Sequence, residues 1–168
     1  ILNKYNLILL CFFFSAGCSP FKVADVLSPY SGYEVTTNVP YGTLERQKLD
    51  IYTPTKKQKS SDIIVFIYGG SWKSGEKSNY RFIAQPVTNA GFVTIVPNYR
   101  LYPEVKFPEF NKDVAKAVAW IHQNFSRLKA SKNIILVGHS AGAHIAALIS
   151  LNPNYLKAEG LSPSIIKS

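Results

Sequence analysis

The stretch Ile134-Ile135-Leu136-Val137-Gly138-His139-Ser140-Ala141-Gly142 decides the fold. Its first four residues form an apolar run that predicts a strand covered on both faces. The small-residue segment Ala141–Leu151 predicts the helix that follows. Between them stands G-x-S-x-G, a pattern in which the strand turns so sharply into the helix that the serine is strained. We expect Gly138 and Gly142 to flank this elbow because a side chain at either position would collide with the strand or the helix.

Outward from this stretch, apolar runs alternate with segments of helical character. Strands are expected at Tyr33–Val39, Lys48–Tyr52, Ile63–Tyr68, Phe92–Val96 and Ile134–Val137. Helices are expected at Ser78–Asn89, with Ser78 as N-cap and Gly91 as the stop, at 108–126 and at Ala141–Leu151. This alternation predicts an α/β fold with a mostly parallel sheet and helices on both faces. The first two strands, separated by Pro40-Tyr41-Gly42, are expected to form an N-terminal antiparallel hairpin.

A double glycine follows the first buried strand. Gly69 and Gly70 let the backbone approach a ligand closely and point N–H groups at an oxygen atom. Together with the N–H of Ala141 at the start of a helix, they are candidates for an oxyanion hole around Ser140. An ordinary Gly-Gly turn is the alternative. The stretch Gly70–Ser78 is close to a phosphate-binding loop, but Glu76 stands before the lysine and breaks its register, so we do not expect nucleotide binding.

Three blocks of the chain resemble the α/β-hydrolase family, in its esterase/lipase branch and near small carboxylesterases and kynurenine formamidase. The blocks are Tyr68–Lys77, Tyr99–Glu104 with Phe107-Pro108 and Asp113-Val114, and Gly138–Gly142. The resemblance covers roughly residues 33–168. It implies a nucleophile at Ser140, an oxyanion loop at Gly69-Gly70, and a structural Asp113 that holds the Arg100 loop. Tyr68 departs from the usual histidine and Ser71 from a usual third glycine, which asks of Ser71 a backbone conformation that glycine reaches more easily.

A serine nucleophile needs a base, and the three histidines do not suit that role. His139 lies inside the elbow and is directed away from Ser140, while His144 and His122 are expected to pack on helices or face solvent. In the family, the acid and the histidine of the triad follow the nucleophile beyond further strands. We therefore expect the base and acid beyond Ser168, a C-terminally truncated, partial fold, and a 168-residue chain that is nearly inactive. The segment 161–166 resembles the entry to the next strand.

The N-terminus is expected to be an export signal. Lys4, an apolar run and Ser15-Ala16-Gly17 precede Cys18, which resembles a bacterial lipoprotein signal. This predicts a signal peptide over 1–17, lipidation of Cys18, and a tether over 18–32. The membrane would then be reached only through the lipid, in a bacterial membrane-anchored lipoprotein. Plain secretion to a periplasmic or extracellular location and a retained segment are the alternatives.

Composition narrows the remaining classes of function. The formal net charge is +9, but the lysines are scattered, so we do not expect a nucleic-acid partner. Two cysteines, both near the N-terminus, give no metal cluster, and no motif indicates a cofactor.

The expected function is therefore a carboxylesterase-like serine hydrolase with a small-molecule ester substrate. One alternative is a non-catalytic exported lipoprotein that uses the same fold for binding. Another is a prolyl-oligopeptidase-like peptidase, whose elbow usually has a glycine where Ala143 stands. The oligomeric state is left open.

Overall fold

A computed structural model of the protein describes residues 27–56, 62–128, 130 and 133–167. Its strands are β1 (Tyr33–Pro40), β2 (Lys48–Pro54), β3 (Ile63–Ile67), β4 (Val93–Pro97) and β5 (Ile134–Gly138). The α-helices are α3 (Arg81–Asn89), α4 (Glu109–Gln123), α5 (Ala141–Leu151) and α6 (Asn154–Ala158). Two short 3₁₀ helices are η1 (Lys77–Tyr80) and η2 (Pro163–Ile165). In the part of the chain that is described, no helix has the length and apolar character needed to cross a bilayer.

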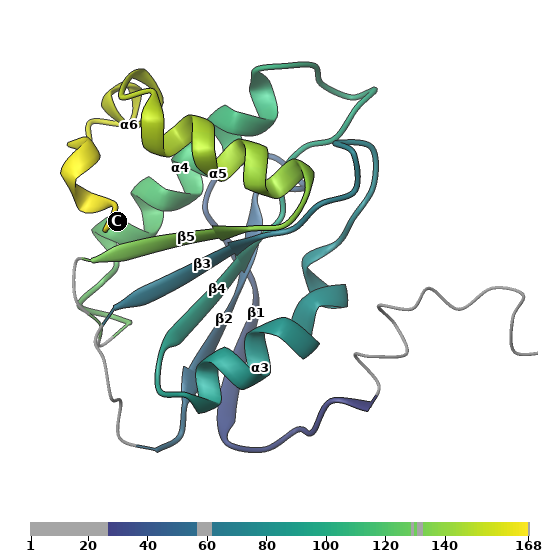
Figure 1. The fold of residues 1–168 in the computed structure, drawn as a ribbon, viewed down its shortest axis with the longest axis vertical. Coiled ribbons are helices and arrows are strands. Elements are labelled where there is room, and N and C mark those ends of the chain that lie inside the picture. Colours follow the sequence, from purple (N-terminus) through teal and green to yellow (C-terminus); the bar gives the residue numbers. More distant parts are fainter. Residues whose placement is uncertain (1–26, 57–61, 129, 131–132, 168) are drawn as a thin grey trace, which may run out of the picture.

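The strands form one sheet in the order β1-β2-β4-β3-β5 (Figure 1). β1 pairs antiparallel with β2, β2 antiparallel with β4, and β3 runs parallel to both β4 and β5. The predicted mixed sheet, with its N-terminal hairpin and parallel centre, is confirmed. The sheet is parallel where apolar runs alternate with helices, because parallel neighbours need a crossover connection.

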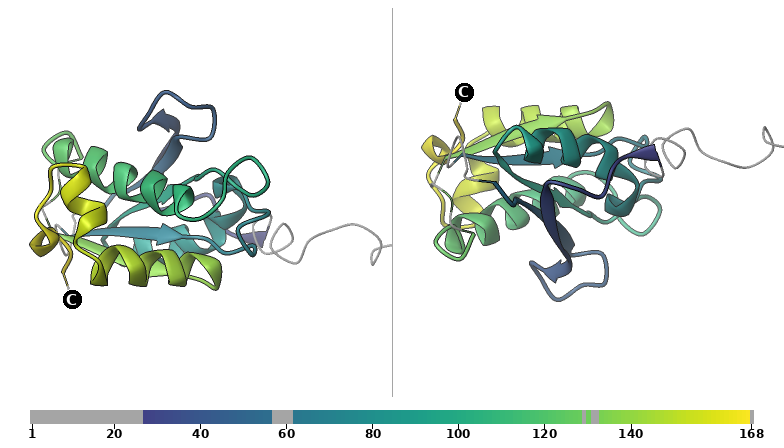
Figure 2. Two further views of the ribbon diagram at one scale, coloured as in Figure 1. Left: turned by 90° about the horizontal axis from the view of Figure 1, so that it is seen from above. Right: turned by 90° about the horizontal axis from the view of Figure 1, so that it is seen from below.

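Helices cover the sheet on both faces, as predicted. The crossovers from β3 to β4 and from β4 to β5 run in opposite directions along the sheet, so right-handed connections place α3 and α4 on opposite faces. Figure 1 shows α4 and α5 together on one side of the strands and α3 on the other. Both views in Figure 2 show α4 and α5 running alongside the strands. The core is fully buried aliphatic side chains from the sheet and helices, among them Leu49, Ile63, Val65, Ile95, Ile121, Ile134 and Ile145.

The helix expected over Ser78–Asn89 differs from the sequence prediction at its start. The helix expected from Ser78 begins instead as η1 and becomes α-helical only at Arg81, and neither start has a side-chain cap. The predicted N-cap at Ser78 is therefore wrong, since helical structure already begins at Lys77, whose N–H donates to Asn98 Oδ1. The expected stop at Gly91 is confirmed by its φ of 101° just past α3.

β5 is less covered than its apolar sequence predicts, since Val137 is 41% exposed. Among the residues described, β3 alone pairs along the length of β5, and the other edge of β5 has one parallel bridge, from Ile134 to Ile166. That bridge agrees with the expected strand entry at 161–166, which the structure begins with η2. Figures 1 and 2 show α6 and the C-terminal residues gathered at the end of the sheet where β5 begins.

Candidate active site

Ser140 stands at the carboxyl end of β5, immediately before the first residue of α5. Its φ is 53° and its ψ −120°, a conformation that residues with a side chain rarely adopt. Such strain costs on the order of 1–3 kcal/mol and persists only where neighbouring structure enforces it. The residue is exposed at the surface of the molecule. The elbow therefore presents the hydroxyl to solvent at the N-terminus of a helix.

The two glycines of the elbow are enforced by close backbone contacts. A Cβ atom on Gly138 would lie 2.5 Å from Cα of Ala143 in α5. A Cβ atom on Gly142 would overlap the carbonyl oxygen of Ile67 at the end of β3. The His139 N–H donates to that same carbonyl over 3.0 Å. Glycine at both positions thus lets strand, turn and helix approach closely enough to form the turn.

The double glycine lies against this elbow. A Cβ atom on Gly69 would come within 2.9 Å of Ser140 Cβ and 2.8 Å of the His139 carbonyl oxygen. Gly70 has a φ of 120°, and a Cβ atom there would overlap the Ser74 carbonyl oxygen. Ser71 has a positive φ of 53°, the glycine-like conformation that was expected where the family usually has a third glycine. The loop and the serine are therefore close enough to contact one small group together.

The N–H of Ala141 is the first of α5, so it has no acceptor within its own helix. It points from the positive end of the helix dipole, where a developing negative charge is stabilised. A carbonyl oxygen attacked by Ser140 could therefore be held between α5 and the Gly69-Gly70 loop.

Tyr68 braces the base of the loop. Its ring is stacked against Tyr80 and Tyr99, with centroids 5.2 and 4.8 Å away. Its hydroxyl donates to Asn98 Oδ1 over 2.8 Å and accepts from Arg46 Nη2 over 3.0 Å. Burial raises the pKa of Tyr68 far above its ordinary value, so the phenol stays neutral and remains a donor. A tyrosine in place of the usual histidine thus still forms hydrogen bonds beneath the loop.

Arg46 is a supporting residue that sequence reasoning missed. From the loop between β1 and β2, its Nη2 donates to the Gly75 carbonyl over 2.9 Å and its Nε to the Tyr99 carbonyl over 2.8 Å. A weaker ion pair joins it to Glu76 over 3.4 Å. The guanidinium therefore ties the far end of the glycine loop to the segment after β4. In the sequence it is one of 19 basic residues, and no local pattern distinguishes it.

Asp113 holds the Arg100 loop, as the sequence predicts. Its carboxylate accepts from the Arg100 backbone N–H over 2.9 Å and from the guanidinium Nε and Nη2, each over 2.8 Å. Gln47 donates to the same carboxylate over 2.9 Å. The bond to Asp113 raises the pKa of Arg100, so the guanidinium stays charged. Asp113 is 1% exposed, and both of its carboxylate oxygens accept hydrogen bonds from these donors. Its role in the fold is therefore structural.

None of the three histidines is hydrogen-bonded to Ser140 in the described structure. His139 and His144 are exposed, and the His144 ring meets the Trp72 ring edge-on with centroids 5.5 Å apart. His122 lies in the last turn of α4 against Phe125. No group of three or more His, Cys, Asp and Glu side chains that could hold a metal gathers among the described residues. Cys18 lies outside them.

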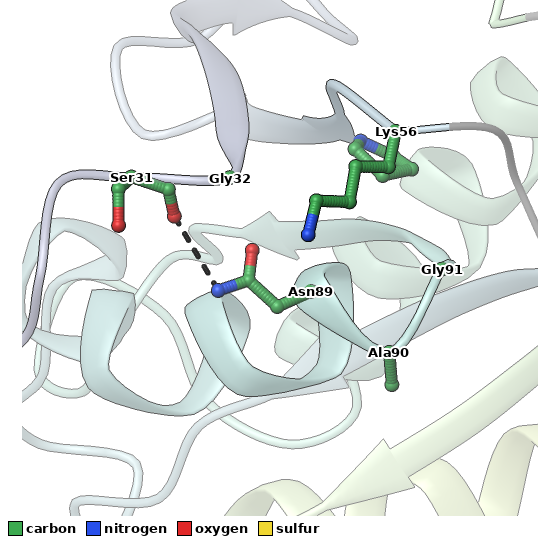
Figure 3. A pocket seen from close by; sticks show the side chains of 7 residues that line it. Ser31, Gly32, Lys56, Asn89, Ala90 and Gly91 are labelled. Carbon is green, nitrogen blue, oxygen red and sulfur yellow. Dashed lines mark hydrogen bonds between the residues drawn. The ribbon is translucent and has the colours of Figure 1, made fainter.

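A pocket lies at the end of the sheet opposite Ser140. It has a volume of about 450 Å³ and is lined by residues from before β1, after β2 and before β4, including Gly32, Lys56 and Asn89 (Figure 3). Asn89 Nδ2 donates to the Ser31 carbonyl across its wall. Ser140 stands instead where the parallel strands end, the edge at which open α/β sheets bind ligands. The pocket is thus separate from the candidate active site.

The mixed sheet, the covering helices and the strained serine at the end of β5 define an esterase-like protein of the α/β-hydrolase type. Comparison with known proteins agrees. The chain belongs to the BD-FAE family, whose model matches residues 49–165, more than half of the sequence.

Two curated relatives share this part of the chain. Kynurenine formamidase of Salmo salar is 34% identical over 112 residues, which cover 67% of this chain and 37% of that protein. Isoprenylcysteine alpha-carbonyl methylesterase ICME of Arabidopsis thaliana is 29% identical over 132 residues, covering 77% of this chain and 31% of the relative. The chain thus spans about a third of the length of these relatives.

Among solved structures, an inhibited esterase B from Lactobacillus rhamnosis superposes with a TM-score of 0.72 at 21% identity. The match covers 93% of this chain and 53% of that one. At this level of identity it shows a shared fold.

Proposed function

We propose that the protein is a serine hydrolase of carboxylic esters in which Ser140 is the nucleophile. The observation that carries the proposal is the strained Ser140 at the start of α5, with Gly69 packed directly against it. The similarity to a methylesterase supports an ester substrate. Because the chain spans about a third of its curated relatives, the activity is proposed for the whole protein.

In the proposed reaction, Ser140 Oγ attacks the ester carbonyl carbon and its proton passes to a histidine base. In the family that the chain resembles, this histidine follows the nucleophile in the sequence. The carbonyl oxygen becomes negatively charged and is held by the N–H groups of Ala141, Gly70 and Gly69. The alcohol then leaves with the proton from the base, and water hydrolyses the acyl-serine to release the acid.

A fluorophosphonate probe tests the nucleophile. We expect it to label the protein expressed from its complete reading frame, and Ser140→Ala to abolish labelling. Ser126→Ala is the matched control, because Ser126 is an exposed serine past the end of α4 and should leave labelling unchanged. Labelling that survives Ser140→Ala, or that fails in the folded wild type, overturns the assignment.

Hydrolysis of a formamide is a second candidate, favoured by the 34% identity to kynurenine formamidase. The same serine and N–H groups would serve, since ester and formamide cleavage share a tetrahedral oxyanion. Measuring kcat/KM for phenyl acetate and for formanilide on one preparation separates the two. A higher value for formanilide favours the formamidase, and a higher value for phenyl acetate favours the esterase.

We also propose that the protein is exported and anchored by a lipid on Cys18. The support is the sequence alone: small residues run into Cys18 after an apolar segment. Mass spectrometry of the protein made in a bacterial host should find residues 1–17 removed and Cys18 acylated. Cys18→Ser should move the protein from the membrane fraction. An unmodified Cys18 in the wild type contradicts the anchor.

A further inference from the structure

An aromatic hollow lies beside the glycine loop. It has a volume of about 220 Å³ and is lined by Trp72, Lys73, Tyr102, Lys106, Phe107 and Phe110. Its walls come from two segments, the end of the glycine loop and the stretch that leads into α4. A cavity of about 150 Å³ is enough to bind benzene, so this hollow has room for one substituted ring.

The hollow adjoins the candidate active site. Ser71, which also lines it, is two residues from Gly69, so their Cα atoms are at most about 7.6 Å apart. Gly69 in turn packs against Ser140. On the α5 side, Trp72 meets His144, one helical turn after the serine. A substrate held at Ser140 would therefore reach the hollow with a group next to its ester carbonyl.

The aromatic walls are fixed in place yet remain open to water. The Tyr102 N–H donates to the Trp72 carbonyl over 2.7 Å, which joins the two segments. The Trp72 ring stacks on Phe110 with centroids 5.9 Å apart. Phe107 is nevertheless 60% exposed and Tyr102 45% exposed. Neighbouring exposed aromatic rings beside an active site are typical of a binding surface.

Two lysines at the hollow have no carboxylate partner. Lys73 Nζ lies over the Tyr102 ring, 5.5 Å from its centroid, and Lys106 lines the same hollow. Neither forms an ion pair with any residue that the structure describes. Glu104, in the same segment, does not line the hollow.

Among the other lysines that the structure describes, three are paired, and Lys48, Lys56, Lys116 and Lys157 are unpaired but do not line the hollow. Lys77, Lys112 and Lys167 each lie within 3.0 Å of an aspartate or glutamate oxygen. Positive charge is thus left uncompensated at the hollow, where aromatic surface is exposed as well.

We propose that this hollow is a substrate subsite for a planar apolar group that carries a negative charge. The ring of the substrate would pack on Phe107 and Tyr102, while Lys73 and Lys106 would hold its carboxylate or other anionic group. The inference rests on the proposed function for its link to Ser140, and its binding chemistry is independent of that function. It predicts a preference for esters with an acidic aromatic group over neutral esters of the same shape.

Calorimetry on the protein from its complete reading frame tests the subsite with 3-phenylpropionate and its neutral analogue 3-phenylpropanamide. We expect the carboxylate to bind about tenfold more tightly than the amide at low salt, with the difference shrinking as ionic strength rises. Lys73→Gln with Lys106→Gln should remove the difference. Phe107→Ala should weaken both compounds. The double variant Lys116→Gln with Lys157→Gln removes the same charge from α4 and α6 and should change nothing.

Competition against the fluorophosphonate places the subsite relative to the serine. Bound 3-phenylpropionate should slow labelling of Ser140. The proposal is overturned if the acid and the amide bind equally. It is also overturned if Ser140 is labelled and bound acid does not slow that labelling. If the acid binds selectively and Ser140 is never labelled, the proposed function fails and the anionic aromatic site stands. If Ser140 is labelled and no selectivity is found, the subsite fails alone.

Discussion

Gly69 and Ser140 pack so closely that a Cβ atom on the glycine would lie 2.9 Å from Cβ of the serine. Contacts below 3.0 Å force a shift, and both neighbours of Gly69 at this point, Ser140 and the His139 carbonyl, belong to the strained elbow. The nucleophile and the candidate oxyanion donors can therefore lie this close only because residue 69 has no side chain.

Gly69→Ala should accordingly separate the loop from the elbow. We expect the rate of fluorophosphonate labelling to fall by about 100-fold, the usual effect of losing one oxyanion donor. Gly160→Ala is the control, because Gly160 also has a positive φ, of 74°, but has open space around it. That variant should label at the wild-type rate. Equal rates for Gly69→Ala and the wild type contradict the close packing.

Arg46→Ala should loosen the glycine loop. The substitution removes the donors to the Gly75 and Tyr99 carbonyls, and we expect the free energy of unfolding to fall by about 2–4 kcal/mol. Urea unfolding followed by circular dichroism measures this change. Arg127→Ala, at an exposed arginine, should fall within about 0.5 kcal/mol of the wild type. A loss no larger than that of Arg127→Ala argues against a bracing role for Arg46.

Asp113→Asn should destabilise the fold while leaving the chemistry at Ser140 intact. Removing the carboxylate leaves the Arg100 guanidinium, 17% exposed, without its main counter-charge. We expect a loss of about 2–3 kcal/mol in the free energy of unfolding. Under conditions in which the variant stays folded, the labelling rate of Ser140 should stay close to that of the wild type. A folded Asp113→Asn protein that no longer labels would instead place Asp113 in the reaction.

Stability should fall in alkali because of buried tyrosines. Burial raises the pKa of Tyr41, Tyr68 and Tyr99 above the ordinary value of 10.0. Below pH 10 both states hold the phenol protons, so the contribution of these tyrosines is complete. Above pH 10 the unfolded chain releases protons that the folded chain keeps, so the free energy of unfolding decreases as pH rises.

Urea unfolding at a series of pH values from 8 to 11, with tyrosinate absorbance recorded in parallel, measures this decrease. The absorbance should show a class of tyrosines that ionises only as the protein unfolds. N-acetyltyrosinamide in the same buffers gives the reference titration of a free phenol. Full ionisation of every tyrosine near pH 10 in folded protein contradicts the burial argument.

The sequence alone was enough to predict the order of strands and helices, the antiparallel start of the sheet and the strained turn at Ser140. These features depend on local rules: apolar periodicity indicates strand or helix, and a serine flanked by glycines between a strand and a helix is typical of a sharp, strained turn. The bond between Asp113 and Arg100 was also predicted, but only through resemblance to a family, since no local rule joins residues 13 positions apart. The helix start at Ser78 was missed because helical structure already begins at Lys77, whose N–H is held by Asn98, a side chain distant in the sequence.

Only the tertiary structure determined what surrounds the serine. Arg46 reaches Gly75 and Tyr99, 29 and 53 positions away in the sequence, and Trp72 reaches Phe110 to form the aromatic hollow. Such contacts depend on how strands cross and helices pack, and a sequence pattern carries no distances between segments. Composition gave only a scattered positive charge. The fold left two of those lysines unpaired beside exposed aromatic rings, because packing, unlike composition, decides which charges find a partner.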